Sequence, residues 1–232
     1  MKVSINQPAY LPWLGYFERI AKSDLHIVLD HVQFEKNSFT NRNKIHGQSG
    51  PVWLTVPLAT SGRFGDLAIS SLQFAHNQNW QRKHWKSLRM AYSKAPHFSR
   101  YAPAYEALYA AEWNSFSPLL RAFLRQHLND FGISTPLLFS SEMDVAGAKS
   151  ELVLNLCRAT GADCYLSGAL GRGYLDQASF TNAGIDIEYQ DYHHPVYTQL
   201  YSNFTPYLCA LDLLFQHGPD SLKILLNSGP ST

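Results

Sequence analysis

Charged side chains are scarce in this sequence: they make up 16% of its 232 residues, against about 25% in ordinary globular domains. Lys and Arg together number 19 and Asp and Glu number 18, so the formal net charge is +1. A chain this close to neutral lacks the basic excess with which proteins bind nucleic-acid phosphates regardless of base sequence. We therefore expect no nucleic-acid partner.

Cysteine is also rare, and no CxxC or HExxH pairing occurs. An odd number of thiols argues against a disulfide framework, and without such pairings the sequence indicates no metal site. Reduced thiols are typical of the cytosol. No apolar run approaches the ~18 residues of a membrane span, and the N-terminus has no signal-peptide pattern. We expect a soluble cytoplasmic protein with no membrane insertion. The three thiols are Cys157, Cys164 and Cys209.

Apolar residues, by contrast, make up 45% of the chain and aromatics 13%, enough to form a large core without staples. Lys2–Asn6 alternates like a strand, Leu14–Ala21 has apolar residues at helical spacing, and residues 24–34 contain a second apolar strand. A strand, a short helix and another buried strand predict a βαβ unit with a right-handed crossover. The predicted fold class is α/β, with a mainly parallel, Rossmann-like sheet flanked by helices.

The rest of the chain alternates between further helical and strand patterns. We predict strands at 51–58, 67–72, 164–168 and 185–190, and helices at 79–90, 103–113, 118–131, 145–160 and 208–215. We expect a single α/β domain over residues 1–232, with a mostly helical insertion or subdomain at about 79–131.

Polar and aromatic residues follow the first two predicted strands, where ligands bind in open α/β sheets. The aromatics could stack on a base or sugar ring, and Arg42 with Lys44 could hold a diphosphate. The alternatives are a rigid loop whose aromatics pack in the core, and a solvated loop with structural Asn turns. The expected substrate-binding residues here are Gln7, Tyr10, Trp13, Tyr16, Gln33, Arg42, Asn43 and Lys44.

A glycine-rich turn follows the predicted strand at 164–168. Exposed backbone N–H groups there could hold an anion, so Ser167 and Gly168 are further substrate-binding candidates. The GxxGxG spacing matches neither the dinucleotide fingerprint nor a P-loop, and Ser167 lacks the GxSxG elbow of a nucleophile. The alternative is a tight turn with no ligand.

Two adjacent histidines follow the strand predicted at 185–190. A neutral histidine is the natural general base near pH 7, so we propose His193 or His194 as proton acceptor, oriented by Asp191. Asp30, at the end of the second strand, completes the catalytic candidates. The alternative is that both histidines are structural.

In order along the chain, these stretches resemble the WbqC-like family. The resemblance covers nearly the whole sequence and is carried by QPAYLPWLGYF at residues 7–17, DHVQF at 30–34, RNKI at 42–45, YLSG at 165–168 and FTPYL at 204–208. The family is associated with bacterial O-antigen and other surface-polysaccharide gene clusters. The resemblance therefore implies a cytoplasmic role in making or modifying an activated sugar, and it supplies no catalytic residues.

Three functional hypotheses follow. The first is a transferase of O-antigen (lipopolysaccharide) biosynthesis that adds an acyl or aminoacyl group to a nucleotide-linked amino sugar. The second is an ATP-dependent ligase or nucleotidyl transferase, because the first βα unit also looks like the opening of the HIGH-type superfamily, although only Gly15 of its His-x-Gly-His signature is present. The third is a non-catalytic binding or scaffold protein. The sequence identifies no cofactor, and a homodimer is one option for its assembly.

Overall fold

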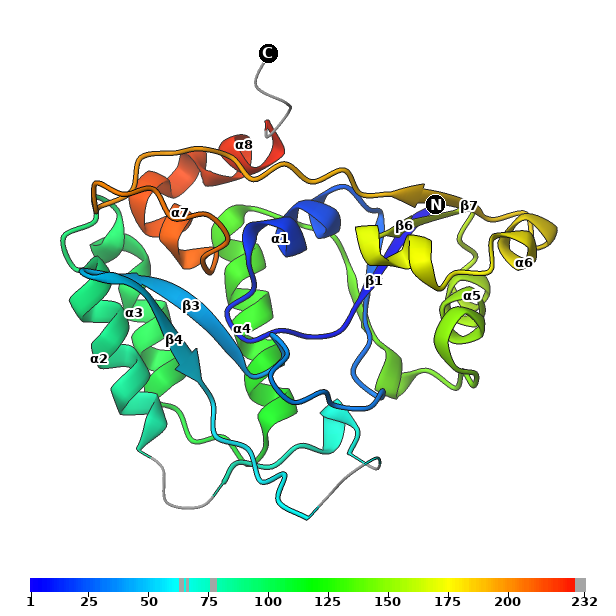
Figure 1. Cartoon of the computed structure of the whole chain (residues 1–232), viewed down its shortest axis with the longest axis horizontal. Coiled ribbons are helices and arrows are strands. Elements are labelled where there is room, and N and C mark those ends of the chain that lie inside the picture. Colours follow the sequence, from blue (N-terminus) through cyan, green and yellow to red (C-terminus); the bar gives the residue numbers. More distant parts are fainter. Residues whose placement is uncertain (63–64, 66, 76–78, 228–232) are drawn as a thin grey trace.

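A five-stranded parallel sheet forms the centre of the molecule. The computed structural model describes residues 1–62, 65, 67–75 and 79–227. The strand order is β5-β2-β1-β6-β7, and every pairing is parallel. Helices flank the sheet, which confirms the predicted fold class (Figure 1). The strands are β1 (Lys2–Asn6), β2 (Leu25–Val28), β5 (Leu137–Phe139), β6 (Cys164–Ser167) and β7 (Asp186–Tyr189).

The first βαβ unit has the predicted boundaries at β1 and at α1 (Leu14–Ala21). Its second strand, β2, is shorter than predicted and ends at Val28. Beyond that point the chain leaves the sheet, because the backbone of Asp30 bonds instead to Ser140 and Ser70. The apolar run at 24–34 therefore predicted the strand but overestimated its length.

Two separate hydrophobic clusters lie on the sheet. Val3, Ile5 and Ile27 pack with residues of α5 (Lys149–Ala159) and α6 (Gln177–Asn182). Val28 and the apolar residues of α1 belong to the other cluster. Alternate residues of a strand point to opposite faces, so the sheet separates the two clusters. Figure 1 shows α5 and α6 on the side of the molecule opposite α2, α3 and α4.

The middle of the chain forms three helices that pack side by side, α2 (Trp80–Tyr92), α3 (Phe98–Ala110) and α4 (Phe116–Phe131). The prediction for α3 was wrong at its start. The helix begins at Phe98, so Pro103 lies inside it rather than in its first turn. A proline there removes one backbone hydrogen bond. The helix continues because Tyr101 and Tyr105 bury their rings on either side of that point.

A two-stranded antiparallel hairpin, β3 (Arg42–Gly47) and β4 (Gly50–Thr55), lies outside the main sheet. The sequence predicted β4 but not its partner. The strand predicted at 67–72 is wrong: the segment forms a 3-10 turn at Ile69–Ser71 and pairs only through the single bridge Gln33–Ala68. Its backbone bonds to the loop after β2 rather than to a strand.

Short elements complete the fold. They are the 3-10 turns η2 (Ser140–Glu142), η3 (Ala169–Gly173) and η4 (Gly218–Asp220), and the helices α7 (Leu211–His217) and α8 (Ser221–Leu226). No helix of the described residues has both the length and the apolar character needed to cross a bilayer.

Candidate functional site

A pocket of about 480 Å³ opens beside the carboxyl ends of β1 and β6. In the strand order, β2 neighbours β1 in one direction, and β6, followed by β7, neighbours it in the other. The carboxyl ends of β1 and β6 are thus a topological switch point, the place where open α/β sheets bind ligands. The wall combines the end of β1, the turn after β6 and part of the segment before β3.

The loop between β1 and α1 forms one side of the pocket and is held rigidly. Leu11 has φ +48°, a conformation that a leucine adopts only under constraint. Asn43, fully buried in β3, donates its side-chain amide to the Leu11 carbonyl at 2.5 Å. The Tyr10 amide donates to the carbonyls of Phe39 and Thr40. The hairpin region therefore fixes the pocket loop.

Arg19 lies in the pocket wall and is the outstanding electrostatic feature of the site. It is only 8% exposed, and burial lowers its pKa. Its side chain makes no hydrogen bond or salt bridge with any residue that the structure describes, and Nε is buried without a partner. Arginine has five donors and keeps its charge, so this guanidinium faces the pocket with unused bonding capacity.

The neighbouring residue, Glu18, shows what a satisfied buried charge looks like in the same helix. Its side chain is 1% exposed, and its carboxylate pairs with Lys22 and accepts a hydrogen bond from Gln190. Gln190 also donates to the carbonyl of Gly15 at 2.8 Å. The charge of Glu18 is therefore paired through direct contacts, whereas Arg19 is attracted by the charge of Glu18 but has no direct ion-pair or hydrogen-bond partner among the described residues.

The turn after β6 brings backbone against this guanidinium. Gly168 approaches so closely that a Cβ there would lie 2.5 Å from Nη1 of Arg19. Ser167 lies beside it in the wall and donates its hydroxyl to the Gly168 carbonyl. Gln7 also lines the pocket, and its side-chain amide makes no hydrogen bond with the described residues. Gln7, Arg19 and the Gly168 turn thus offer polar groups to a ligand.

Four of the predicted substrate-binding residues line this one pocket: Gln7, Trp13, Ser167 and Gly168. Two predicted aromatics, Tyr10 and Tyr16, are instead buried in the core. The Tyr10 hydroxyl bonds to His84 at 2.8 Å and to Tyr109 at 2.5 Å. Gly15 does not admit a ligand, because the ring of Tyr192 packs where its Cβ would be.

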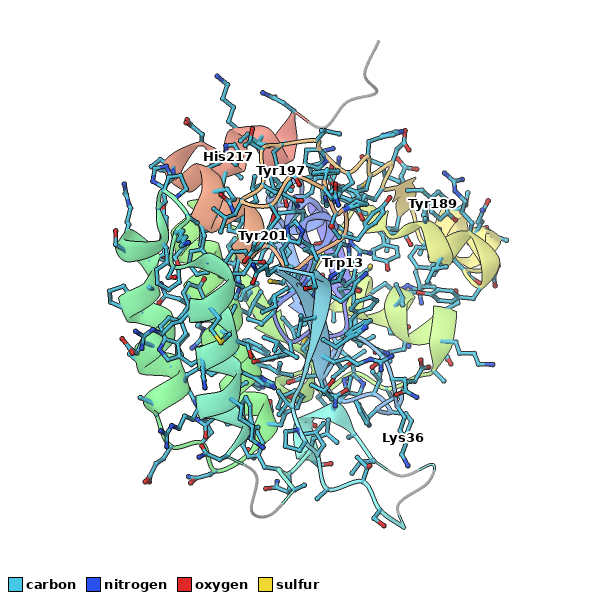
Figure 2. All side chains as sticks on the ribbon, turned by 60° about the vertical axis from the view of Figure 1, so that its left-hand side comes forward. Trp13, Lys36, Tyr189, Tyr197, Tyr201 and His217 are labelled. Atoms are coloured by element: carbon cyan, nitrogen blue, oxygen red, sulfur yellow. The ribbon has the colours of Figure 1, made fainter. Side chains whose placement is uncertain are left out.

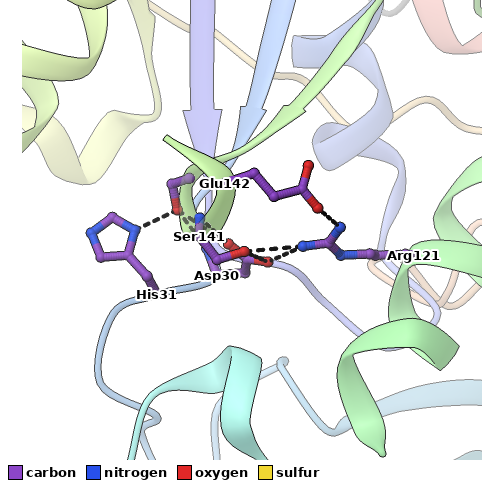
Figure 3. Close-up of polar contacts among 6 residues, drawn as sticks. Asp30, His31, Arg121, Ser141 and Glu142 are labelled. Atoms are coloured by element: carbon purple, nitrogen blue, oxygen red, sulfur yellow. Dashed lines mark hydrogen bonds and ion pairs between the residues drawn. The ribbon is translucent and has the colours of Figure 1, made fainter. Parts of the chain in front are cut away.

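Asp30 lies at the end of β2, next to the end of β5, and outside this pocket. Figure 3 shows its carboxylate among the side chains of Arg121 and Ser141. It accepts from the Ser141 amide at 2.8 Å, from the Ser141 hydroxyl at 2.9 Å and from Arg121 at 2.9 Å. Ser140 donates to it at 3.2 Å and also contacts His31. Both oxygens are engaged, so the geometry favours a role in joining β2 to η2.

The remaining predicted binding residues belong to other parts of the structure. Gln33 donates to the Phe34 carbonyl and accepts from the Leu67 amide. Arg42 and Lys44 project from β3 next to Trp53, with the Arg42 guanidinium 4.6 Å from the Trp53 ring centre. Asn43 acts on the pocket loop through Leu11, as described above.

The proposed proton acceptors lie in the segment after β7 and do not line the pocket. His193 and Asp191 are both exposed, with 3.9 Å between ring nitrogen and carboxylate oxygen. His194 is enclosed by aromatic rings; Nδ1 bonds to the Tyr192 hydroxyl, and Nε2 accepts from the Tyr207 amide. Burial lowers the pKa of His194 to about 4, so the ring is neutral at pH 7.

The described residues contain no cluster of three His, Cys, Asp or Glu side chains that could hold a metal ion. All three thiols are free. Burial raises the pKa of Cys157 and of Cys209 to about 12, and also raises that of Cys164. Nucleophilic cysteines need the thiolate at neutral pH, and these environments disfavour it.

Comparison with known proteins places this architecture in a family. The model of the WbqC-like protein family matches residues 7–224, a span that includes the pocket loop, Arg19 and the turn after β6. The chain belongs to the WbqC-like protein family. It is also 37% identical to the uncharacterized protein Rv1507c of Mycobacterium tuberculosis over 227 residues, which cover 96% of this chain and 97% of that protein. No solved structure matches.

Within this WbqC-like chain, Arg19 is the residue that sequence reasoning missed. The apolar spacing of Leu14–Ala21 puts Leu14, Phe17 and Ile20 or Ala21 on one side of the helix, and that spacing does not single out Arg19. Seven of the eight α1 residues are buried, which only the folded chain shows, so the sequence pattern carries no signal for Arg19.

Proposed function

We propose that this WbqC-like protein is an enzyme that binds a nucleotide-linked sugar in the β1–β6 pocket, with a phosphate against Arg19. The observation that carries the proposal is the buried, unpaired guanidinium in the pocket wall. A buried charge without a partner destabilises the free protein. An anion would supply the missing partner, and the fork of arginine donors matches phosphate oxygens.

The other walls suit the rest of such a ligand. The pocket of about 480 Å³ has the size of ordinary small-molecule sites. Trp13 and Phe39 form an aromatic wall, with ring centres 5.3 Å apart, on which a planar base or the C–H face of a sugar can pack. The resemblance to a family associated with surface-polysaccharide genes supports an activated sugar over other phosphates.

The reaction we propose is transfer of an acyl or aminoacyl group to an amino sugar, within bacterial surface-polysaccharide (O-antigen) biosynthesis. The amine nitrogen forms a bond to the carbonyl carbon of an activated acyl donor such as acyl-CoA. The bond from that carbon to the donor's leaving group breaks, the leaving group departs with the electron pair, and a base takes the amine proton. His193 and His194 are the proposed bases; neither lines the pocket, so the proposal requires the acceptor amine to reach the segment after β7, where His193 is exposed and both ring nitrogens of His194 are hydrogen-bonded. Alanine at each position should lower turnover by at least ~100-fold if it is the base, and full turnover in both variants would remove them from the mechanism.

Binding is tested first, by calorimetry and thermal shift with UDP-, dTDP-, GDP- and CMP-linked sugars, ATP and acyl-CoA. We expect a sugar nucleotide to bind, and Arg19→Gln to weaken it by roughly 10- to 150-fold, the value of one or two charge-assisted hydrogen bonds. Arg158→Gln, which removes an exposed helical arginine, is the matched control. Unchanged affinity in Arg19→Gln would refute the site. Binding of ATP with release of pyrophosphate would favour the ligase hypothesis instead.

A further inference from the structure

The β3–β4 hairpin presents a surface of aromatic and cationic side chains next to the pocket. Lys44 on β3 lies directly opposite Trp53 on β4, and Arg42 opposite Thr55. Side chains two residues apart on a strand share a face, so Arg42, Lys44 and Trp53 lie together. The Trp53 side chain is 46% exposed, which is unusual for so large an apolar ring.

Among the residues that the structure describes, the two cations of this surface have no counter-charge. The Arg42 guanidinium donates there to Asn37, at 2.6 Å to its carbonyl and 3.3 Å to its side chain. The Lys44 ammonium makes no hydrogen bond with the described residues and lies 5.7 Å from the Trp53 ring centre. Neither forms a salt bridge within the described part of the chain. Like charges on one face of a strand pair repel one another, so this face is suited to an anion.

An aromatic path connects this surface to the pocket. Trp13 and Phe39 both line the pocket and lie 5.3 Å apart by ring centre, and Phe39 lies 6.1 Å from Trp53. Figure 2 labels Trp13 beside the hairpin, in the middle of the molecule. The rings of Trp13, Phe39 and Trp53 thus run from the pocket wall to the hairpin cations.

We propose that Arg42, Lys44 and Trp53 form a second subsite, the hairpin subsite, which binds an acidic sugar ring of the same ligand. This inference rests on the proposed function, because it places the phosphate of the sugar nucleotide at Arg19. The C–H face of the ring packs on the aromatic path, and its carboxylate pairs with the two cations. A phosphate alone would use the cations but would make no contact with the exposed Trp53 ring.

The test uses two probes that differ only at C6 of the sugar, UDP-glucose and UDP-glucuronic acid. We expect the intact protein to bind UDP-glucuronic acid about 10-fold more tightly in calorimetry. Lys44→Gln should reduce this preference to less than about 3-fold. Trp53→Ala should weaken both probes, and Arg19→Gln should weaken both strongly. Lys86→Gln, which removes an exposed cation of α2, should change neither affinity.

Equal affinity for the two probes would overturn the hairpin subsite, as would a preference that survives both Lys44→Gln and Arg42→Gln. In either case, binding of UDP-glucose that still depends on Arg19 would leave the proposed function intact. Binding of neither probe would also overturn the subsite, and the wider ligand panel would then decide the proposed function separately. Circular dichroism and thermal unfolding of each variant exclude loss of fold as the cause of lost binding.

Discussion

Replacing Arg19 with methionine should stabilise the free protein while abolishing its anion site. Substituting a buried ionic group by an apolar residue of similar volume is often neutral or stabilising by about 1–4 kcal/mol when the charge is poorly compensated. Arg19 is 8% exposed and makes no hydrogen bond with the described residues through its side chain. We therefore expect Arg19→Met to raise the free energy of unfolding by about 1–3 kcal/mol.

The assay is urea and thermal unfolding at pH 7, with and without ligand. For a chain of this length each kcal/mol shifts Tm by about 2–4 °C, so the free variant should melt roughly 2–12 °C above the natural protein. Sugar nucleotide at 100 times its Kd should stabilise the natural protein by about 2.7 kcal/mol. With affinity weakened roughly 10- to 150-fold, the variant should gain only about 0.3–1.4 kcal/mol from the same ligand concentration. The exposed Arg158→Met control should change stability by less than about 0.5 kcal/mol.

A loss of more than about 2 kcal/mol in free Arg19→Met would refute this reasoning. Losses of that size arise when a buried partner is left unpaired, and would mean that the charge is compensated within the protein. The same result would remove the main physical support for the proposed function, because the guanidinium would then have no unmet need for a ligand.

Three further predictions address the pocket wall, the Asp30 network and a buried acid. Gly168→Ala places a Cβ 2.5 Å from Nη1 of Arg19 and should weaken anion binding about 10-fold or more by displacing it, whereas Gly173→Ala, which meets no atom within 4 Å, should bind normally in calorimetry. Asp30→Asn should lower the free energy of unfolding in urea by about 3 kcal/mol without changing ligand affinity, and unchanged stability would contradict the bonding network. Burial raises the pKa of Asp212 to about 6. Its contribution to stability is therefore complete below about pH 4 and is lost as the pH rises through 6. The free energy of unfolding of Asp212→Asn, measured relative to that of the natural protein, should increase by about 2–3 kcal/mol between pH 4 and pH 7, and a constant difference across that range would contradict the raised pKa.

Local patterning was sufficient for some elements and insufficient for others. β1 and α1 were predicted residue for residue, because each has a regular apolar period bounded by clear breakers. β3 reads RNKIHG and has only one strongly apolar residue. It forms a strand because β4 pairs with it and because the buried side chain of Asn43 donates a hydrogen bond to the Leu11 carbonyl. The three residues of β5 form a strand only by pairing with β2.

The candidate site likewise contains residues that sequence patterns predict and one, Arg19, that they do not. The general rule that ligands bind at the carboxyl ends of parallel strands was enough to select Gln7, and the glycine-rich turn was enough to select Ser167 and Gly168. All three line the pocket. Arg19 needed tertiary information. Its helix is covered on the outer side as well, where Tyr192 packs against Gly15 and Gln190 bonds to Glu18. That covering segment lies about 170 residues away in sequence, beyond the reach of any periodicity.

The hydrogen bonds around the pocket also explain why its cation can act without rearrangement. Tyr10 and Leu11 are tied to the hairpin region, and the turn at Gly168 closes on the guanidinium itself. A ligand therefore meets a site whose backbone is already ordered, so little conformational entropy is lost on binding. The unfavourable desolvation of Arg19 occurs when the protein folds and is not repeated when the anion arrives. Under the proposed function, the destabilisation expected of the free protein and its expected affinity for an anion are two consequences of the same buried charge.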